Sequence, residues 1–315
     1  MKQETGHLGN LTPQQEHTLQ EFKKNIPSLP PRYDDYYFLR FLRARQFKLQ
    51  EALEMFHNYL QWRQEVDADS AISFEFPEAN EIKKFYPQCY HKTDRQGRPI
   101  YIERLGQLDL DKLFQITSEE RLFRYFVREY EKLVLKVFPS CSKAAGFKVE
   151  TNLSILDLSG VSMKLMNKKT INMVKATSKI CQDYYPEILG EMLIVNCPRL
   201  FSMGWNTVKG FLNEKTRSKI HILGSDYSKA LFERVDPENV PEFLGGNCRC
   251  PEGCINQNAG PWNDFEEPSE HILEVNSLSS EEEVEEVEIG VHDLKEKDMQ
   301  RVLEVLEFKK QNLKL

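Results

Sequence analysis

The sequence lacks the long hydrophobic runs, leader segments and paired cysteines that mark membrane-spanning and secreted proteins. No stretch of its 315 residues approaches about 18 consecutive apolar residues, so none is expected to cross a bilayer. The first eleven residues are polar, which argues against a secretory signal peptide. The seven cysteines are odd in number and mostly scattered, which disfavours a disulfide framework. A reducing compartment fits best, so we expect a cytoplasmic protein.

Glycine-rich and catalytic motifs are also missing. Neither G-x-G-x-x-G nor G-x-x-x-x-G-K-[ST] follows an expected strand, and neither G-x-S-x-G nor H-E-x-x-H occurs. The sequence therefore lacks the motifs that are typical of dehydrogenases, nucleotide hydrolases and α/β-hydrolases. Asp157 and Glu187 flank expected strands but have no recognisable histidine or carboxylate partner nearby in sequence. We expect no catalytic residues, no enzyme and no cofactor.

The net charge of −7 is unevenly distributed along the chain. Residues 264–315 carry 16 acidic and 6 basic side chains, which leaves 33 acidic and 36 basic in residues 1–263. A slightly basic body thus carries an acidic tail, so the overall charge does not exclude anionic partners. Nucleic acid is a poor candidate, because the body is only +3 and no nucleic-acid-binding motif occurs. We favour a solvated tail over an amphipathic helix near residues 294–308.

The first 79 residues predict a small helical unit. Thr12 can cap a helix, Pro13 suits its first position and Gln15 completes a capping box. Further helices are expected at 35–46 and 49–66, where apolar residues recur at helical spacing.

From about residue 80, short apolar runs alternate with longer helical patterns. Strands are expected at 99–103, 153–158, 191–197 and 219–224, and helices at 117–137, 164–182, 198–212 and from 225. Thr117-x-x-Glu120 predicts a capping box at the first of these helices. Because such alternation requires crossover connections, we predict an α/β lobe with a mostly parallel sheet at 80–263. The tail follows at 264–315.

Cys248, Cys250 and Cys254 form the one cluster with metal-like spacing. A structural zinc site takes four ligands, and the nearest histidine downstream is His271. Without a convincing fourth ligand, we expect surface-loop thiols and no metal.

The segment 198–212 has an unusually wide apolar face. At 100° per residue its large apolar side chains cover about 200°, roughly twice what an ordinary amphipathic helix needs. They include Leu200, Phe201, Trp205, Val208 and Phe211. The width fits either a helix buried on two sides or a lid over an apolar cavity, and by itself does not decide between them.

Basic residues gather in two places. Arg40, Arg43 and Arg45 lie in one short expected helix, and we assign Arg40 and Arg43 to a solvated face. Lys215, Arg217 and Lys219 surround Thr216 just before the last expected strand. Such groups suit an anionic phosphate.

Specific strings then resemble a known family. They are, in chain order, Phe41-Leu-Arg-Ala-Arg45, Phe85-Tyr-Pro-Gln88, Tyr90-His-Lys-Thr-Asp94, Gly97-Arg-Pro99, Thr117-Ser-Glu-Glu-Arg121, Val149-Glu-Thr151, Tyr184-Tyr-Pro-Glu187, Ser218-Lys219 and Gly260-Pro-Trp262. Together, over about residues 12–263, they resemble the CRAL-TRIO family and its phosphatidylinositol/phosphatidylcholine transfer proteins. The resemblance implies a lipid-binding lobe whose sheet floors a hydrophobic cavity, with 198–212 as a helical gate over it.

The family's binding residues map onto matching positions here. The resemblance implies that phosphatidylinositol is held by Arg45, Asp94, Glu187, Thr216 and Lys219. It implies that phosphatidylcholine is held by Tyr90, Tyr101, Tyr130 and Ser154. Cation–phosphate pairing and the attraction of tyrosine rings for a quaternary ammonium agree with these roles.

Two positions depart from the family pattern. Gln46 stands where the family has a lysine that pairs with the Y-Y-P-E glutamate, which leaves Glu187 short of a cation. Asn152 replaces a smaller serine beside the choline site. These departures leave open whether the second ligand is phosphatidylcholine or another lipid.

The resemblance implies a lipid transfer protein that presents its ligand for phosphoinositide metabolism and vesicle traffic. Its expected partners are phospholipid and a transient membrane surface, with phosphoinositide kinases served indirectly. We expect a monomer in the cytoplasm that visits Golgi or endosomal membranes. The alternatives are a carrier of another hydrophobic ligand, such as a sterol, tocopherol or retinoid, and an interaction scaffold that uses the acidic tail.

Overall fold

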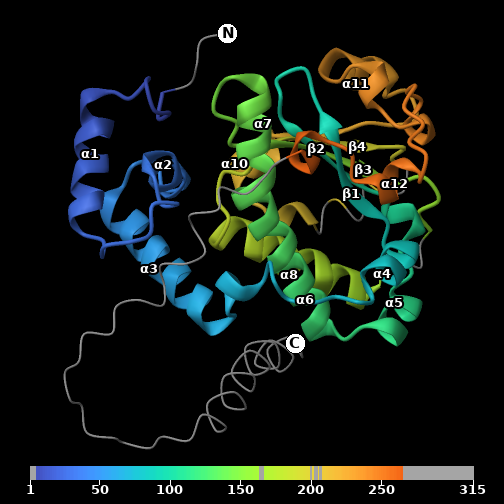
Figure 1. The fold of residues 1–315 in the computed structure, drawn as a ribbon, viewed down its shortest axis with the longest axis horizontal. Coiled ribbons are helices and arrows are strands. Elements are labelled where there is room, and N and C mark those ends of the chain that lie inside the picture. Colours follow the sequence, from blue (N-terminus) through green and yellow to red (C-terminus); the bar gives the residue numbers. More distant parts are fainter. Residues whose placement is uncertain (1–4, 163–166, 199–200, 202–204, 206–207, 265–315) are drawn as a thin grey trace, which may run out of the picture. The chain divides into compact units, whose positions relative to one another are not determined.

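Three helices form the N-terminal part of the chain in the computed structural model, which describes residues 5–162, 167–198, 201, 205 and 208–264. They are α1 (Pro13–Lys24), α2 (Asp35–Ala44) and α3 (Leu49–Glu65) (Figure 1). The predicted capping box of α1 is confirmed: the hydroxyl of Thr12 accepts the N–H of Gln15 at 3.2 Å, and the Gln15 side chain accepts the N–H of Thr12 at 2.9 Å.

Arg40 and Arg43 on α2 are buried, so the prediction of a solvated face was wrong. Both approach the carboxylate of Glu150, from Arg43 Nη2 at 3.4 Å and from Arg40 Nε at 4.0 Å. Because Glu150 comes just before the sheet strand β3 (Asn152–Asp157), these arginines join the helical part to the lobe. Burial opposes ionisation of Glu150, but His7 and the two arginines hold its pKa below the usual value.

A sheet of five strands lies at the centre of the lobe, in the order β1-β2-β3-β4-β5. The pair β1–β2 is antiparallel and the other pairs are parallel, which confirms the predicted α/β class. The strand β1 was not predicted. The strands are β1 (Gln88–Thr93), β2 (Pro99–Glu103), β3 (Asn152–Asp157), β4 (Leu189–Val195) and β5 (Ile220–Ile222).

Helices cover the sheet and connect its strands. They are α4 (Ala79–Phe85), α5 (Leu110–Ile116), α6 (Glu119–Lys132), the π-helical η3 (Leu133–Val137), α7 (Phe138–Ala145), α8 (Lys168–Asp183), α10 (Glu214–Ser218), α11 (Ser228–Arg234) and α12 (Cys254–Gln257). Short 3-10 turns are η1 (Ala68–Ser70), η2 (Leu105–Gln107), η5 (Lys209–Phe211), η6 (Pro237–Asn239), η7 (Glu242–Leu244) and η8 (Pro261–Asn263). The cap of α6 is Ser118, which accepts from the N–H of Arg121, so the predicted capping box at Thr117 was wrong by one residue.

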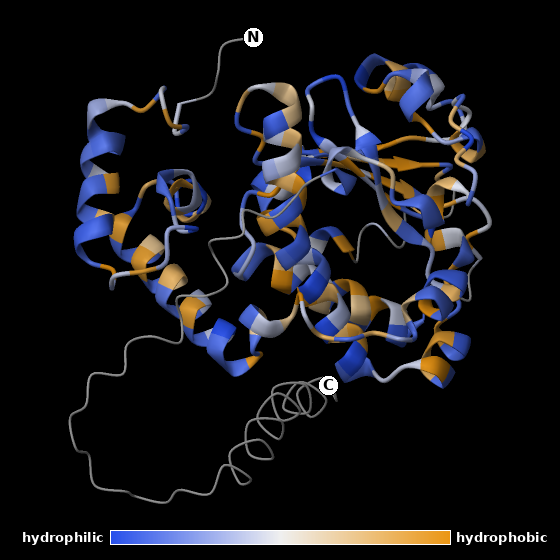
Figure 2. Cartoon of the chain, in the orientation of Figure 1, coloured by the Kyte–Doolittle hydropathy of each residue, from blue (hydrophilic) through white to orange (hydrophobic). Residues whose placement is uncertain are grey.

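The two faces of the sheet differ in how they are covered. On one face, which we call the covered face, Ile100, Ile102, Leu153 and Leu193 are buried and pack against Leu231 of α11 and its neighbours. Stretches of the central strands are hydrophobic and appear orange in Figure 2. Because side chains alternate along a strand, the residues between these four point to the opposite face, the open face.

The C-terminal part of the described chain folds back along β1. The backbone N–H of Lys92 donates to the carbonyl of Ala259, and Trp262 is fully buried. A Cβ atom at Gly260 would lie 2.3 Å from the Trp262 ring, so only glycine allows this approach. Cys248 and Cys254 are also buried, so the prediction of surface-loop thiols was wrong for both.

The described residues belong to one compact unit, 1–265. One hydrophobic cluster runs from Leu19 and Phe56 of the helical part to Val137 and Trp262 of the lobe. The boundary drawn at residue 79 stays a prediction, and the tail beyond Asp264, like His271, lies outside the described residues.

Candidate functional site

One row of side chains crosses the open face from edge to edge. Strand register places Tyr90 opposite Tyr101, Tyr101 opposite Ser154, Ser154 opposite Met192 and Met192 opposite Ile220. We call these five residues the central row. Three of its members (Tyr101, Met192 and Ile220) are only partly buried, unlike the buried residues of the covered face. The row therefore changes from aromatic and hydroxyl groups at β1–β3 to aliphatic groups at β4–β5, as a surface for an amphiphile would.

Three of the four predicted choline-site residues lie together in this row. The rings of Tyr90 and Tyr101 are 5.3 Å apart, and Ser154 lies beside Tyr101 on the next strand. Tyr130, the fourth, comes from α6 and stacks on Tyr185 at 4.8 Å. Burial raises the pKa of Tyr130 well above its ordinary value, and Cys181 and Tyr90 add to the shift. Tyr130 packs against the hydrophobic cluster that contains Tyr90 of the row.

Polar atoms without partners flank the central row. Asn152 donates to the Ser154 hydroxyl at 3.1 Å, but its own carbonyl oxygen has no partner among the described residues. The Gln88 carbonyl oxygen accepts from the Tyr101 hydroxyl, while its amide nitrogen is unpaired among the same residues. Buried polar atoms are nearly always hydrogen-bonded in proteins, so these two atoms indicate where a ligand or water binds.

Glu103 is a residue of this face that the sequence analysis missed. It follows Tyr101 by two residues on β2 and accepts a hydrogen bond from the Tyr86 hydroxyl at 2.7 Å. Burial raises its pKa to about 7, against the opposing effect of the Tyr86 and Tyr101 hydroxyls. The period-two alternation that placed Tyr101 on one face of its strand could have identified Glu103 as its neighbour.

A charged cluster lies where β4 and β5 begin. Glu187 Oε2 is 2.8 Å from Lys215 Nζ and 3.5 Å from Lys219 Nζ, and Lys219 also donates to the Leu189 carbonyl at 2.7 Å. Burial opposes the charge on Glu187, but the two lysines keep its pKa below the usual value. The prediction that Gln46 leaves Glu187 short of a cation was therefore wrong.

Thr216 stands between these two lysines on α10. Its backbone N–H donates to the side chain of Asn213, which caps the helix. The structure thus brings three of the predicted inositol-site residues together, namely Glu187, Thr216 and Lys219. It adds Lys215 as a partner of Glu187, a pairing that the sequence analysis did not predict.

The Tyr184-Tyr185-Pro186-Glu187 string fixes this glutamate in position. The Tyr184 ring stacks on Trp62 at 4.1 Å, and the Tyr185 hydroxyl donates to Glu131 at 2.5 Å. Glu187 then adopts a left-handed backbone, with φ of 61°, which turns it toward the lysines. Such a conformation is uncommon outside glycine and is held by the contacts on either side.

Arg45 ends α2 and lines an open cleft of about 540 Å³. The cleft is shared with Lys175, Lys179 and Gln182 of α8 and with Asn213, the cap of α10. Arg45 is partly exposed and its guanidinium meets the carbonyl of Ala44 at 3.3 Å. It therefore reaches the same cleft as the start of α10, from the side of the helical unit.

Asp94 is engaged within the turn between β1 and β2. Its Oδ2 lies 2.6 Å from Arg98 Nε, and its Oδ1 accepts from the N–H groups of Gln96 and Arg98. Arg98 in turn lies 3.5 Å from Glu191 on β4. Asp94 therefore orients an ion pair between Arg98 and Glu191, and its contact with lipid stays a prediction.

The predicted gate is described at four of its five residues. Phe201, Trp205 and Val208 are helical and partly buried, the rings of Phe201 and Trp205 are 6.4 Å apart, and Leu200 lies outside the described residues. The segment ends in η5, where the Phe211 carbonyl accepts from Gln182 of α8 at 2.9 Å. No described helix is both long and apolar enough to cross a membrane.

Comparison with known proteins matches both parts of the chain to one family. Residues 83–246 match the CRAL/TRIO domain and residues 7–58 the CRAL/TRIO N-terminal domain. The chain is 47% identical to the Sec14 cytosolic factor of Schizosaccharomyces pombe over 262 residues, which cover 82% of this chain and 91% of that protein. It is 45% identical to the phosphatidylinositol/phosphatidylcholine transfer protein SFH9 of Arabidopsis thaliana over 80% of this chain but 45% of that longer protein.

A solved structure supports the fold. The crystal structure of Sfh5 matches with a TM-score of 0.62 at 22% identity, covering 79% of this chain and 92% of that one. The two matched domains agree with the high identity over most of the chain. The chain belongs to the CRAL-TRIO family.

Proposed function

We propose that this protein is a non-enzymatic lipid transfer protein that exchanges phosphatidylinositol and phosphatidylcholine between membranes. The observation that carries the proposal is the open sheet face, where Tyr101, Met192 and Ile220 of the central row stay partly uncovered. The names of the Arabidopsis relatives support the same lipids.

The charged cluster is the proposed site for the inositol headgroup. Lys219 and Arg45 neutralise the phosphate, and Thr216 donates a hydrogen bond to it. Glu187, held ionised by its two lysines, accepts from inositol hydroxyls. Asp94 acts at a distance by orienting Arg98.

The tyrosine end of the central row is the proposed site for the choline headgroup. The faces of Tyr90, Tyr101 and Tyr130 attract the quaternary ammonium, and the Ser154 hydroxyl donates to the phosphate. Aliphatic groups at β4 and β5 receive the acyl chains.

We extend the proposal to the cellular role. The protein acts as a monomer in the cytoplasm, meets Golgi or endosomal membranes transiently, and supplies phosphatidylinositol to kinases without binding them stably. The gate closes the cavity between membrane encounters, because an acyl chain in water is costly.

A vesicle-to-vesicle transfer assay tests the proposal. We expect the Arg45→Ala/Lys219→Ala double variant to lose phosphatidylinositol transfer and to keep phosphatidylcholine transfer. Lys168→Ala/Lys229→Ala removes the same charge from exposed positions and serves as the matched control. Unchanged phosphatidylinositol transfer in the first double variant would refute the site assignment.

The other candidate, a carrier of a sterol, tocopherol or retinoid, predicts a different bound ligand. Mass spectrometry of the ligand that copurifies with the protein separates the two. Recovery of an isoprenoid or sterol in place of glycerophospholipid would favour the carrier.

A further inference from the structure

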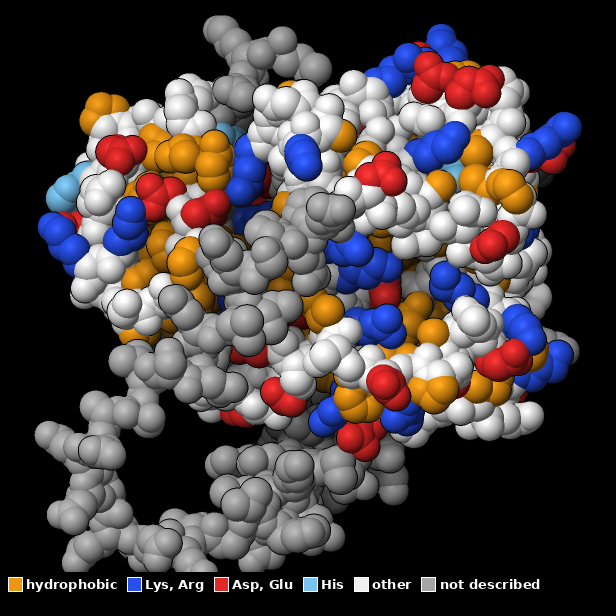
Figure 3. Space-filling model, viewed as in Figure 1, with side chains coloured by type: hydrophobic (Ala, Val, Ile, Leu, Met, Phe, Trp, Pro, Cys, Tyr) orange, Lys and Arg blue, Asp and Glu red, His pale blue; other side chains and the backbone are white. Residues whose placement is uncertain are grey.

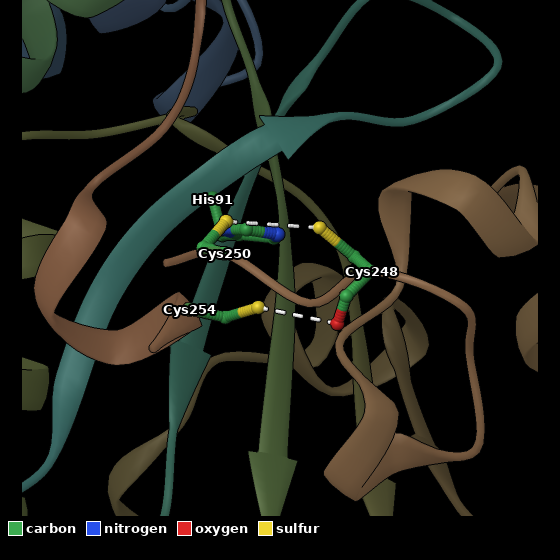
Figure 4. A group of neighbouring side chains, drawn as sticks. All are labelled: His91, Cys248, Cys250 and Cys254. Atoms are coloured by element: carbon green, nitrogen blue, oxygen red, sulfur yellow. Dashed lines mark hydrogen bonds between the residues drawn. The ribbon is translucent and has the colours of Figure 1, made fainter. Parts of the chain in front are cut away.

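Four potential metal ligands converge on the covered side of β1. They are His91 on β1, Cys248 and Cys250 on the loop after η7, and Cys254 at the start of α12 (Figure 4). All four ligating atoms lie within 4.8 Å of one another. The sequence analysis found the three cysteines but not the histidine, because His91 is separated from them by most of the lobe.

Backbone hydrogen bonds fix the shape of the loop that carries the cysteines. The N–H of Cys248 donates to the Val240 carbonyl at 3.0 Å, and the Cys248 carbonyl accepts from Glu242 at 3.1 Å. Gly253, with φ of 80°, closes a turn by donating to the Cys250 carbonyl at 2.9 Å. The turn directs Cys254 back toward Cys248, whose carbonyl the Cys254 thiol meets at 3.4 Å.

The environment of His91 is independent evidence for a bound metal ion. Its side chain is completely buried, and neither ring nitrogen has a hydrogen-bond partner among the described residues. Leaving a buried polar group without a hydrogen-bond partner is unfavourable. In Figure 4 the imidazole points into the space between the sulfur atoms. A metal ion there would satisfy one of its nitrogens.

The spacing of the sulfurs agrees with metal binding and not with a disulfide. Cys248 Sγ and Cys250 Sγ are 3.7 Å apart. Tetrahedral coordination with Zn–S bonds of about 2.3 Å places two sulfurs about 3.8 Å apart. A disulfide requires a separation of about 2 Å.

We propose that His91, Cys248, Cys250 and Cys254 bind one Zn²⁺ ion in a structural site. Three thiolates and one imidazole form a donor set typical of structural zinc, and four protein ligands leave no open position for catalysis. The proposal is independent of the lipid that the protein carries.

The ion would fix the C-terminal loop to β1. His91 lies next to Tyr90, whose ring packs against Trp262 at 6.1 Å. A zinc ion on the covered side therefore holds the strand whose other side bears Tyr90, the first residue of the central row.

Metal analysis of the full chain tests the proposal directly. We expect elemental mass spectrometry to find one zinc ion per chain in the reduced protein. After removal of zinc, Co²⁺ should give the charge-transfer and visible bands of tetrahedral thiolate coordination. Failure of the reduced, folded chain to take up either ion overturns the proposal, as does Co²⁺ bound without thiolate bands or a native site filled by iron.

Variants then assign the ligands. Cys250→Ser changes a partly exposed ligand and should weaken zinc binding by more than about 100-fold. Substituting residues that only support metal ligands already lowers metal affinity by about 10- to 100-fold. Cys197→Ser changes a partly exposed thiol outside the group and should leave zinc binding unchanged. Circular dichroism checks that both variants fold. Equal zinc affinity in the two variants would contradict the assignment.

Discussion

Glu103 is a carboxyl group of the open face whose ionisation is shifted by burial. Its pKa is raised to about 7 from 4.5, so the folded state favours the neutral carboxyl. This preference stabilises the fold fully below pH 4.5 and is lost as the pH rises through 7.

Glu103→Gln should therefore match the wild type near pH 4.5 and be more stable at pH 8. The side chain stays neutral and can still accept from Tyr86. A shift of this size corresponds to at most about 3 kcal/mol, and less where water reaches the carboxyl. Urea unfolding of the lipid-free proteins at several pH values measures the difference, and a difference independent of pH would contradict the prediction.

We predict that Asn152 influences the choice of the second ligand through its side-chain oxygen, which has no partner among the described residues. Phosphatidylcholine has no N–H or O–H group to donate, so it cannot satisfy this atom. We expect Asn152→Ser to raise phosphatidylcholine transfer relative to phosphatidylinositol transfer by a few fold. Competition between the two lipids in a single transfer assay measures the ratio, with Ser140→Ala as a control buried elsewhere.

At this scale the sequence predicts residue types well and partners poorly. Thr216, Lys219 and Glu187 were predicted and lie together, because a string of residues fixes each of them locally. Lys215 as the partner of Glu187, and His91 beside the cysteines, depend on strands that meet only in the folded chain.

Helix α3 is joined to α6 by a buried ion pair. Arg63 meets Glu131 through two bonds, Nη1 to Oε1 at 2.7 Å and Nη2 to Oε2 at 3.0 Å, and both side chains are about 5% exposed or less. Tyr185, from the string that positions Glu187, donates to the same carboxylate.

Arg63→Met should destabilise the protein by about 3–5 kcal/mol, because it leaves a buried carboxylate without its cation. Lys23→Met breaks the exposed pair with Asp35 and should cost less than about 1 kcal/mol. Urea unfolding gives both values. Arg63→Met/Glu131→Leu should recover part of the loss, and equal costs for the two single variants would disprove the argument.

The segment 198–212 is predicted to move during exchange. A charge at the partly buried Val208 should slow lipid transfer at least about fivefold, since the gate must pass through an apolar environment. Val208→Asp should change the unfolding free energy by about 1 kcal/mol. Ser228→Asp, at the exposed start of α11, adds the same charge away from the gate and should leave transfer unchanged. A loss of transfer no greater than the loss of stability would exclude the gating role.

Elements with strong hydrophobic periodicity were predicted and the others were not. The strands β2, β3 and β4 are apolar runs and were recognised within about two residues. The strand β1 contains Gln88, His91 and Lys92 and has no such run, although its Cys89 joins the aliphatic cluster of the covered face. Tertiary contacts, and not the local sequence pattern, thus determine that this segment forms a strand.

For the whole molecule, the sequence places a −10 tail after a +3 body. On the face drawn in Figure 3, Lys and Arg side chains lie in several groups among hydrophobic patches. An acidic tail and an anionic membrane would both be attracted to such groups.

Truncation after Asp264 should raise transfer from anionic vesicles at low salt by roughly two- to fivefold. The difference should vanish near 1 M salt, where the screening length is about 3 Å, and on neutral vesicles at any salt. Transfer rates of the full and truncated chains across salt concentrations provide the measurement. Equal rates under every condition would dismiss competition between tail and membrane.

The central row also has a direction and a length. Five strands about 4.8 Å apart make it roughly 19 Å long, measured across the strands and not along them. A molecule lying in this direction meets hydroxyl groups over one half of its length and methyl groups over the other. The width of the sheet therefore limits how far a ligand that lies across the strands can stay in contact with the row before it must bend.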